Sequence, residues 1–131
     1  MALWHGISRR KPTGGRLKRP NRYRGKRRKE IASENQHAFL GDSDSRKVYR
    51  KHAGSQTVRV MQAHTINISD PKTGKTFSST MTNIIQNDAD PNFVRRNIVT
   101  KGAIAETEAG NVRITSRPGM DGVVCGVLLD E

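Results

Sequence analysis

The sequence has few of the residues on which most disulfide-bonded, membrane and metal-binding proteins depend. Among its 131 residues there is a single cysteine, Cys125, which excludes an internal disulfide. No run approaches the roughly 18 consecutive apolar residues of a membrane helix. The first residues are too few and too polar to form a signal-peptide core. We therefore expect a cytoplasmic protein that has no membrane partner and keeps its thiol in a reducing compartment.

Hydrophobic residues are also scarce, at 33% of the chain, against about 45–50% in ordinary globular proteins. The chain can therefore bury one modest core. Acids are scarce at the N-terminal end. Residues 1–30 hold twelve Lys and Arg and one acid, a net charge of +11. Residues 31–131 hold twelve Lys and Arg and eleven acids, a net charge of +1. We expect residues 1–30 to be a basic extension, residues 31–45 a connecting segment and residues 46–131 one domain.

The basic arm should not fold alone in water, because its cations repel one another and little apolar surface offsets the entropy of ordering. Charge this dense is typical of interaction tails rather than of merely solubilising ones, and nucleic acid is the commonest polyanion. Trp4 and Tyr23 are candidates for stacking on bases, although Trp4 is equally suited to capping the core. The arm cations expected to meet RNA phosphates are Arg9, Arg10, Lys11, Arg16, Lys18, Arg19, Arg22, Arg24, Lys26, Arg27, Arg28 and Lys29.

The body has the alternating pattern of short strands. Over residues 57–69 the apolar face holds Val58, Val60, His64, Ile66 and Ile68, with Gln62 out of place, and over residues 75–87 it holds Phe77, Met81 and Ile85. The turn signal Asp-Pro-Lys-Thr-Gly between them predicts a hairpin. Further strands are expected at 46–52, 103–107, 111–116 and 123–129, a loop at 117–122, and a short helix or loop at 31–40. This pattern predicts an antiparallel barrel or sandwich.

No constellation of catalytic or metal-binding residues stands out. The segment ending in Gly74-Lys75-Thr76 imitates a P-loop, but Ser69 stands where that loop needs glycine, and a strand pattern follows where it needs a helix. Cys125 lies in an apolar run and should be a buried small side chain. Other groups lack the spacing or setting of a site: His5, His37, His52, His64, Asp42, Asp44, Asp88, Asp90, Glu106 and Glu108. We expect no enzyme activity, metal, cofactor or small-molecule substrate.

A second group of cations lies in the body. Arg95 and Arg96 are adjacent, so a strand would turn one of them inward, whereas a loop would let both point out. Lys101 follows, and Arg117 lies in a later turn. These four cations could form one phosphate-binding patch on a rigid scaffold. The alternative is scattered surface charge.

Five segments, in order and over nearly the whole chain, strongly resemble the family of small-subunit ribosomal protein eight of archaeal and eukaryotic type, in its short archaeal form. They are WHGISRRKPTGGRLK, KRRKEI, DPKTGK, NFVRRNIVTKGAI and TSRPGMDGVV. The resemblance implies a β-barrel with a basic extension threaded into small-subunit ribosomal RNA. By the family's motifs, the residues against RNA would be Arg9, Arg10, Lys11, Thr13, Gly14, Gly15, Arg16, Arg95, Arg96 and Lys101. Residues 33–45 match poorly, and Met120 stands where the family usually has glutamine, so nothing is carried over there.

We therefore expect an all-β chain, a small antiparallel β-barrel of about six strands with an extended basic N-terminal arm. Its expected role is a structural constituent of the small ribosomal subunit, located in the cytoplasm. Its partners would be small-subunit ribosomal RNA and neighbouring ribosomal proteins. The arm would pass between RNA helices and neutralise their phosphates. The alternatives are a free RNA chaperone or chromatin-type nucleic-acid-binding protein, and a basic nuclease, which would need clustered acids or histidines.

Overall fold

The computed structural model gives the structure of residues 10–18 and 34–129. By its internal contacts the chain divides into two units, Met1–Asn35 and Gln36–Glu131. Among the helices in the described residues, none has the length and apolar character that spanning a bilayer requires.

In the first unit, residues 10–18 form a tight turn. Arg10 and Arg16 are paired by an antiparallel bridge. The Lys11 N–H donates to the Gly15 carbonyl oxygen at 2.8 Å, and the Gly14 N–H donates to the Lys11 carbonyl oxygen at 2.9 Å. Gly14 has a φ of +84°, which glycine adopts without steric cost. This part of the arm therefore has local backbone order, although every one of its residues is exposed and none builds a core.

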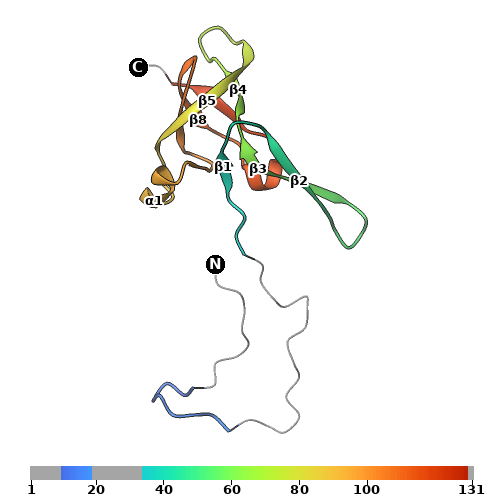
Figure 1. The fold of residues 1–131 in the computed structure, drawn as a ribbon, viewed down its shortest axis with the longest axis vertical. Coiled ribbons are helices and arrows are strands. Elements are labelled where there is room, and N and C mark those ends of the chain that lie inside the picture. Colours follow the sequence, from blue (N-terminus) through green and yellow to red (C-terminus); the bar gives the residue numbers. More distant parts are fainter. Residues whose placement is uncertain (1–9, 19–33, 130–131) are drawn as a thin grey trace. The chain divides into compact units, whose positions relative to one another are not determined.

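The regular structure of the second unit is mostly β-strand and forms two sheets (Figure 1). One is a closed barrel of strand order β4-β5-β7-β8-β9, and the other is a four-stranded sheet of order β2-β3-β1-β6. In chain order the elements are β1 (Ala38–Leu40), β2 (Ser45–Arg50), β3 (Gln56–Ala63), β4 (Thr65–Ser69), β5 (Thr76–Gln86), α1 (Pro91–Arg95), β6 (Ile98–Val99), β7 (Ile104–Thr107), β8 (Gly110–Ile114), α2 (Pro118–Asp121) and β9 (Cys125–Leu128).

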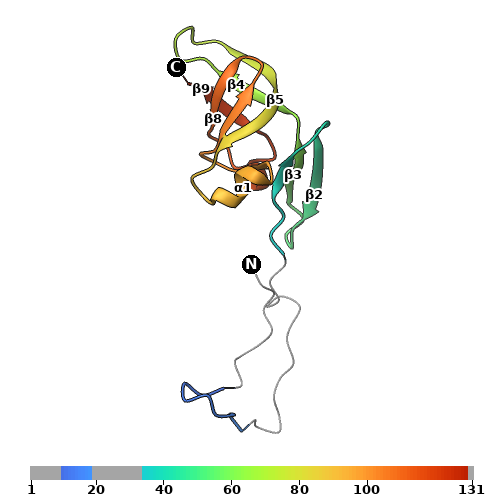
Figure 2. The ribbon, with the colours of Figure 1, turned by 60° about the vertical axis from the view of Figure 1, so that its left-hand side comes forward.

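The prediction of a β-barrel is confirmed, but the predicted number of strands and their antiparallel pairing are wrong. It has five strands rather than about six, and it is mixed rather than antiparallel, because β9 pairs with β4 in parallel. Parallel pairing requires a long crossover between the two strands, and here much of the chain intervenes. The remaining strands form the second sheet, in which β1 also pairs in parallel with β3. Figure 2 shows β2 and β3 beside the barrel rather than within it.

The strand predicted at 57–69 is two strands, which belong to different sheets. It breaks at His64, between β3 and β4. Val60, Ala63 and Ile66 are buried at intervals of three residues, so the period of two is interrupted around the break and resumes with Ile68. Gln62, which looked out of place in a single strand, is exposed. It was the sequence signal of this break.

The face predicted for residues 75–87 is correct at Met81 only. Phe77 is 42% exposed and Ile85 is 48% exposed, while Met81 and Ile84 are buried. The pairing of β5 with β7 shifts register between Met81 and Asn83 and again between Ile84 and Gln86. Each irregularity moves the following side chains to the other face, so a strict period of two fails here.

The 70–74 hairpin turn is confirmed, while several short elements differ from expectation. Asp70 accepts hydrogen bonds from the Lys72 N–H at 2.9 Å and the Thr73 hydroxyl at 2.7 Å. Strand β5 follows this turn, as predicted, where a P-loop would need a helix. Residues 38–40 form a strand, and residues 118–121 form a helical turn rather than a loop. Cys125 is half-buried rather than fully buried.

The core lies largely inside the barrel. Its largest fully buried side chains are Ile66, Ile68, Ile84, Ile98, Ile114 and Val112. Burying each such side chain contributes about 1.5–3 kcal/mol. The barrel is therefore a rigid base for the loops and helices at its edge.

Candidate nucleic-acid interface

Helix α1 positions Arg95 and Arg96. The Asp90 side chain caps it by accepting the Asn92 N–H at 2.8 Å, and Pro91 occupies the first turn. Arg95 ends the helix and Arg96 is its C-cap, and both are exposed. Of the two readings of this pair, the one in which both side chains point outward is correct. The two arginines lie at the end of a short helix rather than in a loop.

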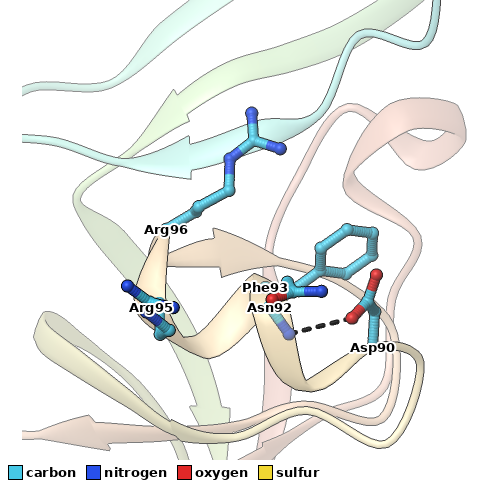
Figure 3. A pocket seen from close by; sticks show the side chains of 5 residues that line it. All are labelled: Asp90, Asn92, Phe93, Arg95 and Arg96. Atoms are coloured by element: carbon cyan, nitrogen blue, oxygen red, sulfur yellow. Dashed lines mark hydrogen bonds between the residues drawn. The ribbon is translucent and has the colours of Figure 1, made fainter.

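A surface hollow of about 500 Å³ lies beside this helix end (Figure 3). In Figure 3, Arg95 and Arg96 point in different directions from the end of the helix. The Arg96 guanidinium carbon lies 5.9 Å from the centroid of the Phe39 ring, within cation–π range. The hollow is lined by Asp90, Asn92, Phe93, Arg95 and Arg96. Two cations at the edge of such a hollow can meet an anion from two sides.

Lys101 and Arg117 line a second hollow, of about 230 Å³, together with His37 and Met120. Both cations are exposed, and Met120 is 67% exposed. Helix α2 holds Arg117 in place, because the Arg117 N–H donates to the Asp121 carboxylate at 2.7 Å. Lys101 and Arg117 are distant in the sequence, and the fold places them in one hollow.

Gly122 ties α2 to β3. It has a φ of +73°, and a Cβ built on it would lie 2.9 Å from the Cβ of Val58. Only glycine combines this backbone conformation with so close an approach. The Arg-Pro-Gly-Met-Asp-Gly motif therefore has a local structural reason: proline starts the helical turn, aspartate bonds back to its start, and glycine seats it on β3.

The two hollows are linked by an aromatic contact. The ring of His37, in the second hollow, lies 5.1 Å from the ring of Phe93, in the first. The four predicted cations therefore form two pairs, one in each hollow.

Four of the predicted arm cations lie in the described residues: Arg10, Lys11, Arg16 and Lys18, all exposed, with Thr13, Gly14 and Gly15 in the same turn. The Arg10 Nη1 donates to the Gly14 carbonyl oxygen at 3.3 Å. The other predicted arm residues lie outside the described part of the chain: Trp4, Arg9, Arg19, Arg22, Tyr23, Arg24, Lys26, Arg27, Arg28 and Lys29.

Sequence reasoning missed a third basic region, the hairpin of β2 and β3. It carries Arg46, Lys47, Arg50, Lys51 and Arg59. The signal that could have revealed it is the absence of any acid between Asp44 and Asp70. A net charge near zero for the whole body concealed this local excess.

The described residues hold no group of three or more His, Cys, Asp or Glu side chains placed to bind a metal ion. Hydrogen bonds within the fold lower the pKa of two acids, Asp44 and Asp70. Burial favours a higher pKa for Asp44, but hydrogen bonds from the Thr65 hydroxyl and from the backbone of His64 and Thr65 outweigh it and lower the pKa below 3.8. The hydrogen bond from Thr73 and the backbone bond from Lys72 likewise lower the pKa of Asp70.

A small β-barrel with exposed cations on its helix ends and hairpin belongs to the class of basic β-barrel proteins. The family model for Ribosomal protein S8e matches residues 4–129. The chain is 40% identical over 131 residues to Small ribosomal subunit protein eS8 of Methanococcus aeolicus, covering 100% of both chains. It is 46% identical over 127 residues to the protein of the same name from Methanospirillum hungatei, covering 97% of this chain and 98% of the relative.

The chain therefore belongs to the ribosomal protein S8e family, a family of structural, non-enzymatic proteins. A third relative, Small ribosomal subunit protein eS8 of Methanococcoides burtonii, is 42% identical over 127 residues, covering 97% of this chain and 98% of its own. The family resemblance read from the five sequence segments is confirmed.

Proposed function

We propose that this chain is a structural constituent of the small ribosomal subunit in the cytoplasm, where it binds ribosomal RNA and adjoins other small-subunit proteins. Its family membership and the names of its relatives support the assignment to the subunit. The observation that carries the RNA contact is the charge division, +11 on residues 1–30 against +1 on residues 31–131.

In the proposed mechanism, residues 1–30 lie between RNA helices and neutralise phosphates that would otherwise repel one another. Each neutralised phosphate also releases condensed counterions, so the contact is stabilising although the free arm repels itself. The turn at residues 10–18 would present Arg10 and Arg16 side by side to such a phosphate-rich groove. The two hollows of the body would add fixed contacts through Arg95, Arg96, Lys101 and Arg117.

Sedimentation of a cell lysate through a sucrose gradient, after a high-salt wash, tests this function. We expect the protein to sediment with the small subunit at one copy per subunit. Many cation–phosphate contacts together with a docked body should hold it there through the high-salt wash. Recovery at the top of the gradient would contradict the proposal and favour a free RNA chaperone. Recovery with DNA would contradict it as well and favour a chromatin-type protein.

A further inference from the structure

The hairpin of β2 and β3 is a strongly charged projection of the body. It extends away from the barrel, with its turn at the far end (Figures 1 and 2). Four of its cations are exposed and Arg59 is half-buried. The turn is closed by the Lys51 N–H, which donates to the Ser55 carbonyl oxygen at 2.8 Å. A projection with five cations and no acid is complementary to a polyanion.

One face of the hairpin holds its cations in fixed positions. Lys47 pairs with Arg59 across the strands, and Tyr49 pairs with Thr57. The Lys47 Nζ lies 5.3 Å and the Arg59 guanidinium carbon 5.2 Å from the centroid of the Tyr49 ring. Both distances are in cation–π range. Cations held this way have already lost part of their side-chain freedom, so binding an anion costs them less entropy.

Tyr49 is itself anchored, which strengthens this arrangement. Its hydroxyl donates a hydrogen bond to the Gln36 side-chain oxygen. The Arg59 Nε is buried without a hydrogen-bond partner in the structure. Among residues 10–18 and 34–129, no acid forms an ion pair with Arg59, and its guanidinium lies over the Tyr49 ring.

The opposite face of the hairpin is covered only near the barrel. Val58 packs there against Gly122, the C-cap of α2. Val48, the cross-strand partner of Val58, is 56% exposed and lies between the exposed Arg46 and Arg50 on the same face. Cations therefore flank the hairpin on both faces and at its turn, which suits a ligand that passes along it.

We propose that the β2–β3 hairpin is a second RNA-binding element, separate from the basic arm, and that it binds the sugar–phosphate backbone. This inference rests on the proposed function in that its ligand is RNA. The backbone is favoured over the bases because both cations already lie over the Tyr49 ring, the aromatic surface on which a base would stack. Its contacts fix position rather than read sequence.

Charge removal at matched sites in the full chain tests the proposal. Lys47→Gln with Arg50→Gln removes two exposed hairpin cations, and Lys75→Gln with Arg113→Gln removes two exposed cations from the barrel. The probe is a transcript of archaeal small-subunit ribosomal RNA, titrated at several salt concentrations. If each hairpin cation meets one phosphate, the slope of log affinity against log salt falls by about 1.4–1.8, and affinity falls roughly tenfold or more near 0.1 M salt. The barrel pair should change both quantities little.

Three other outcomes would contradict the hairpin site. Equal losses for the two pairs would show that net charge alone matters, and would overturn the hairpin site. Unchanged RNA affinity of the hairpin pair with reduced entry into subunits would also overturn it, in favour of an acidic neighbouring protein. If the unmodified chain does not bind the transcript, the proposed RNA-binding function fails, and the hairpin site fails with it. Thermal unfolding of each variant, unchanged from the parent, excludes loss of the fold.

Tyr49 is a positioning residue in this site, because its ring holds Lys47 and Arg59 in place. Tyr49→Leu removes the ring under Lys47 and Arg59 while leaving every cation in place, so RNA affinity should fall about two- to fivefold with the salt slope retained. Tyr49→Phe keeps the ring and loses only the hydroxyl, and should restore affinity. Equal RNA affinities of the Leu and Phe variants would overturn the positioning role of the Tyr49 ring.

Discussion

Gly126, in β9, sets how closely that strand approaches the barrel interior. A Cβ built on it would lie 2.4 Å from Val112 Cγ1, 2.8 Å from the Arg113 carbonyl oxygen and 3.2 Å from Ile66 Cδ1. Val112 and Ile66 are fully buried, and the Arg113 oxygen belongs to the backbone of the neighbouring strand β8. The site therefore has no room for a side chain of any size.

Replacing this glycine should strain the barrel. We expect Gly126→Ala to lower the free energy of unfolding by about 1–3 kcal/mol, because the neighbouring strands must move apart. Gly119→Ala is the matched control, since a Cβ there has no atom within 4 Å, and should change it by about 0.5 kcal/mol at most. Urea unfolding of both variants measures the difference. Equal stabilities would show that the barrel relaxes around the new methyl group.

Single residues were predictable where the strand is regular and not where it is irregular. Ile66 and Ile68 alternate cleanly and were correctly assigned to the core. Phe77 and Ile85 were not, because β5 has two register shifts that only its partner β7 reveals. In the same way, the sequence contains Tyr49 but cannot show that β3 brings Arg59 over its ring.

At the scale of elements, Asp44 fixes the junction between the two sheets. Its carboxylate accepts the His64 N–H at 2.7 Å, the Thr65 N–H at 3.1 Å and the Thr65 hydroxyl. These donors lie where β3 of the second sheet ends and β4 of the barrel begins. The same contacts lower the pKa of Asp44, in spite of the opposing effect of burial.

The stability given by this junction should depend on pH. Because the pKa of Asp44 is lower in the folded state, its contribution is complete above the ordinary pKa near 4 and is lost as the pH falls through the folded value. We expect Asp44→Ala to cost about 1 kcal/mol at pH 7, and the gap to the parent to narrow toward pH 3. Asp42→Ala, at an exposed neighbouring acid, should show no such gap. Thermal unfolding across this pH range checks both variants, and a gap independent of pH would contradict the assignment.

Long strands and turns were predictable as elements, whereas short elements were not. The hairpin around residues 70–74 follows from two alternating runs and a turn motif. Helix α1 is too short to show a period, although Asp90-Pro91 is a recognisable capping signal that went unread. Strand β1 has three residues and exists because β3 and β6 pair with it.

At the scale of the whole molecule, the sequence predicted the division of charge and missed the division of the body into two sheets. Charge is additive along a chain and can be counted. Pairing between β4 and β9 joins segments far apart in sequence, and no local pattern specifies it. The candidate site was accordingly predictable as a set of cations, and its arrangement into two hollows and a hairpin was not.

The two units should have different roles, with residues 1–30 supplying most of the RNA affinity and the body supplying the stable fold. Deleting residues 1–30 should leave a body that unfolds cooperatively, because the buried core lies within Gln36–Glu131. If the arm contacts about eight phosphates, the full chain loses roughly 10³–10⁵-fold in RNA affinity between 50 and 200 mM salt. The shortened chain should bind weakly and depend far less on salt. Titration of both chains with the same transcript measures this, and strong salt-sensitive binding after the deletion would contradict the arm mechanism.

The parallel pair of β4 and β9 also sets an order of events during translation. Until residues 125–128 have been made, β4 lacks one of its two neighbours and presents unpaired N–H and carbonyl groups along that edge. At about 5–20 residues per second, the ribosome leaves the sheet open for roughly several seconds. The basic segment has been synthesised before any of these strands. If residues 1–30 bind RNA as proposed, a nascent chain can make that contact before its barrel closes.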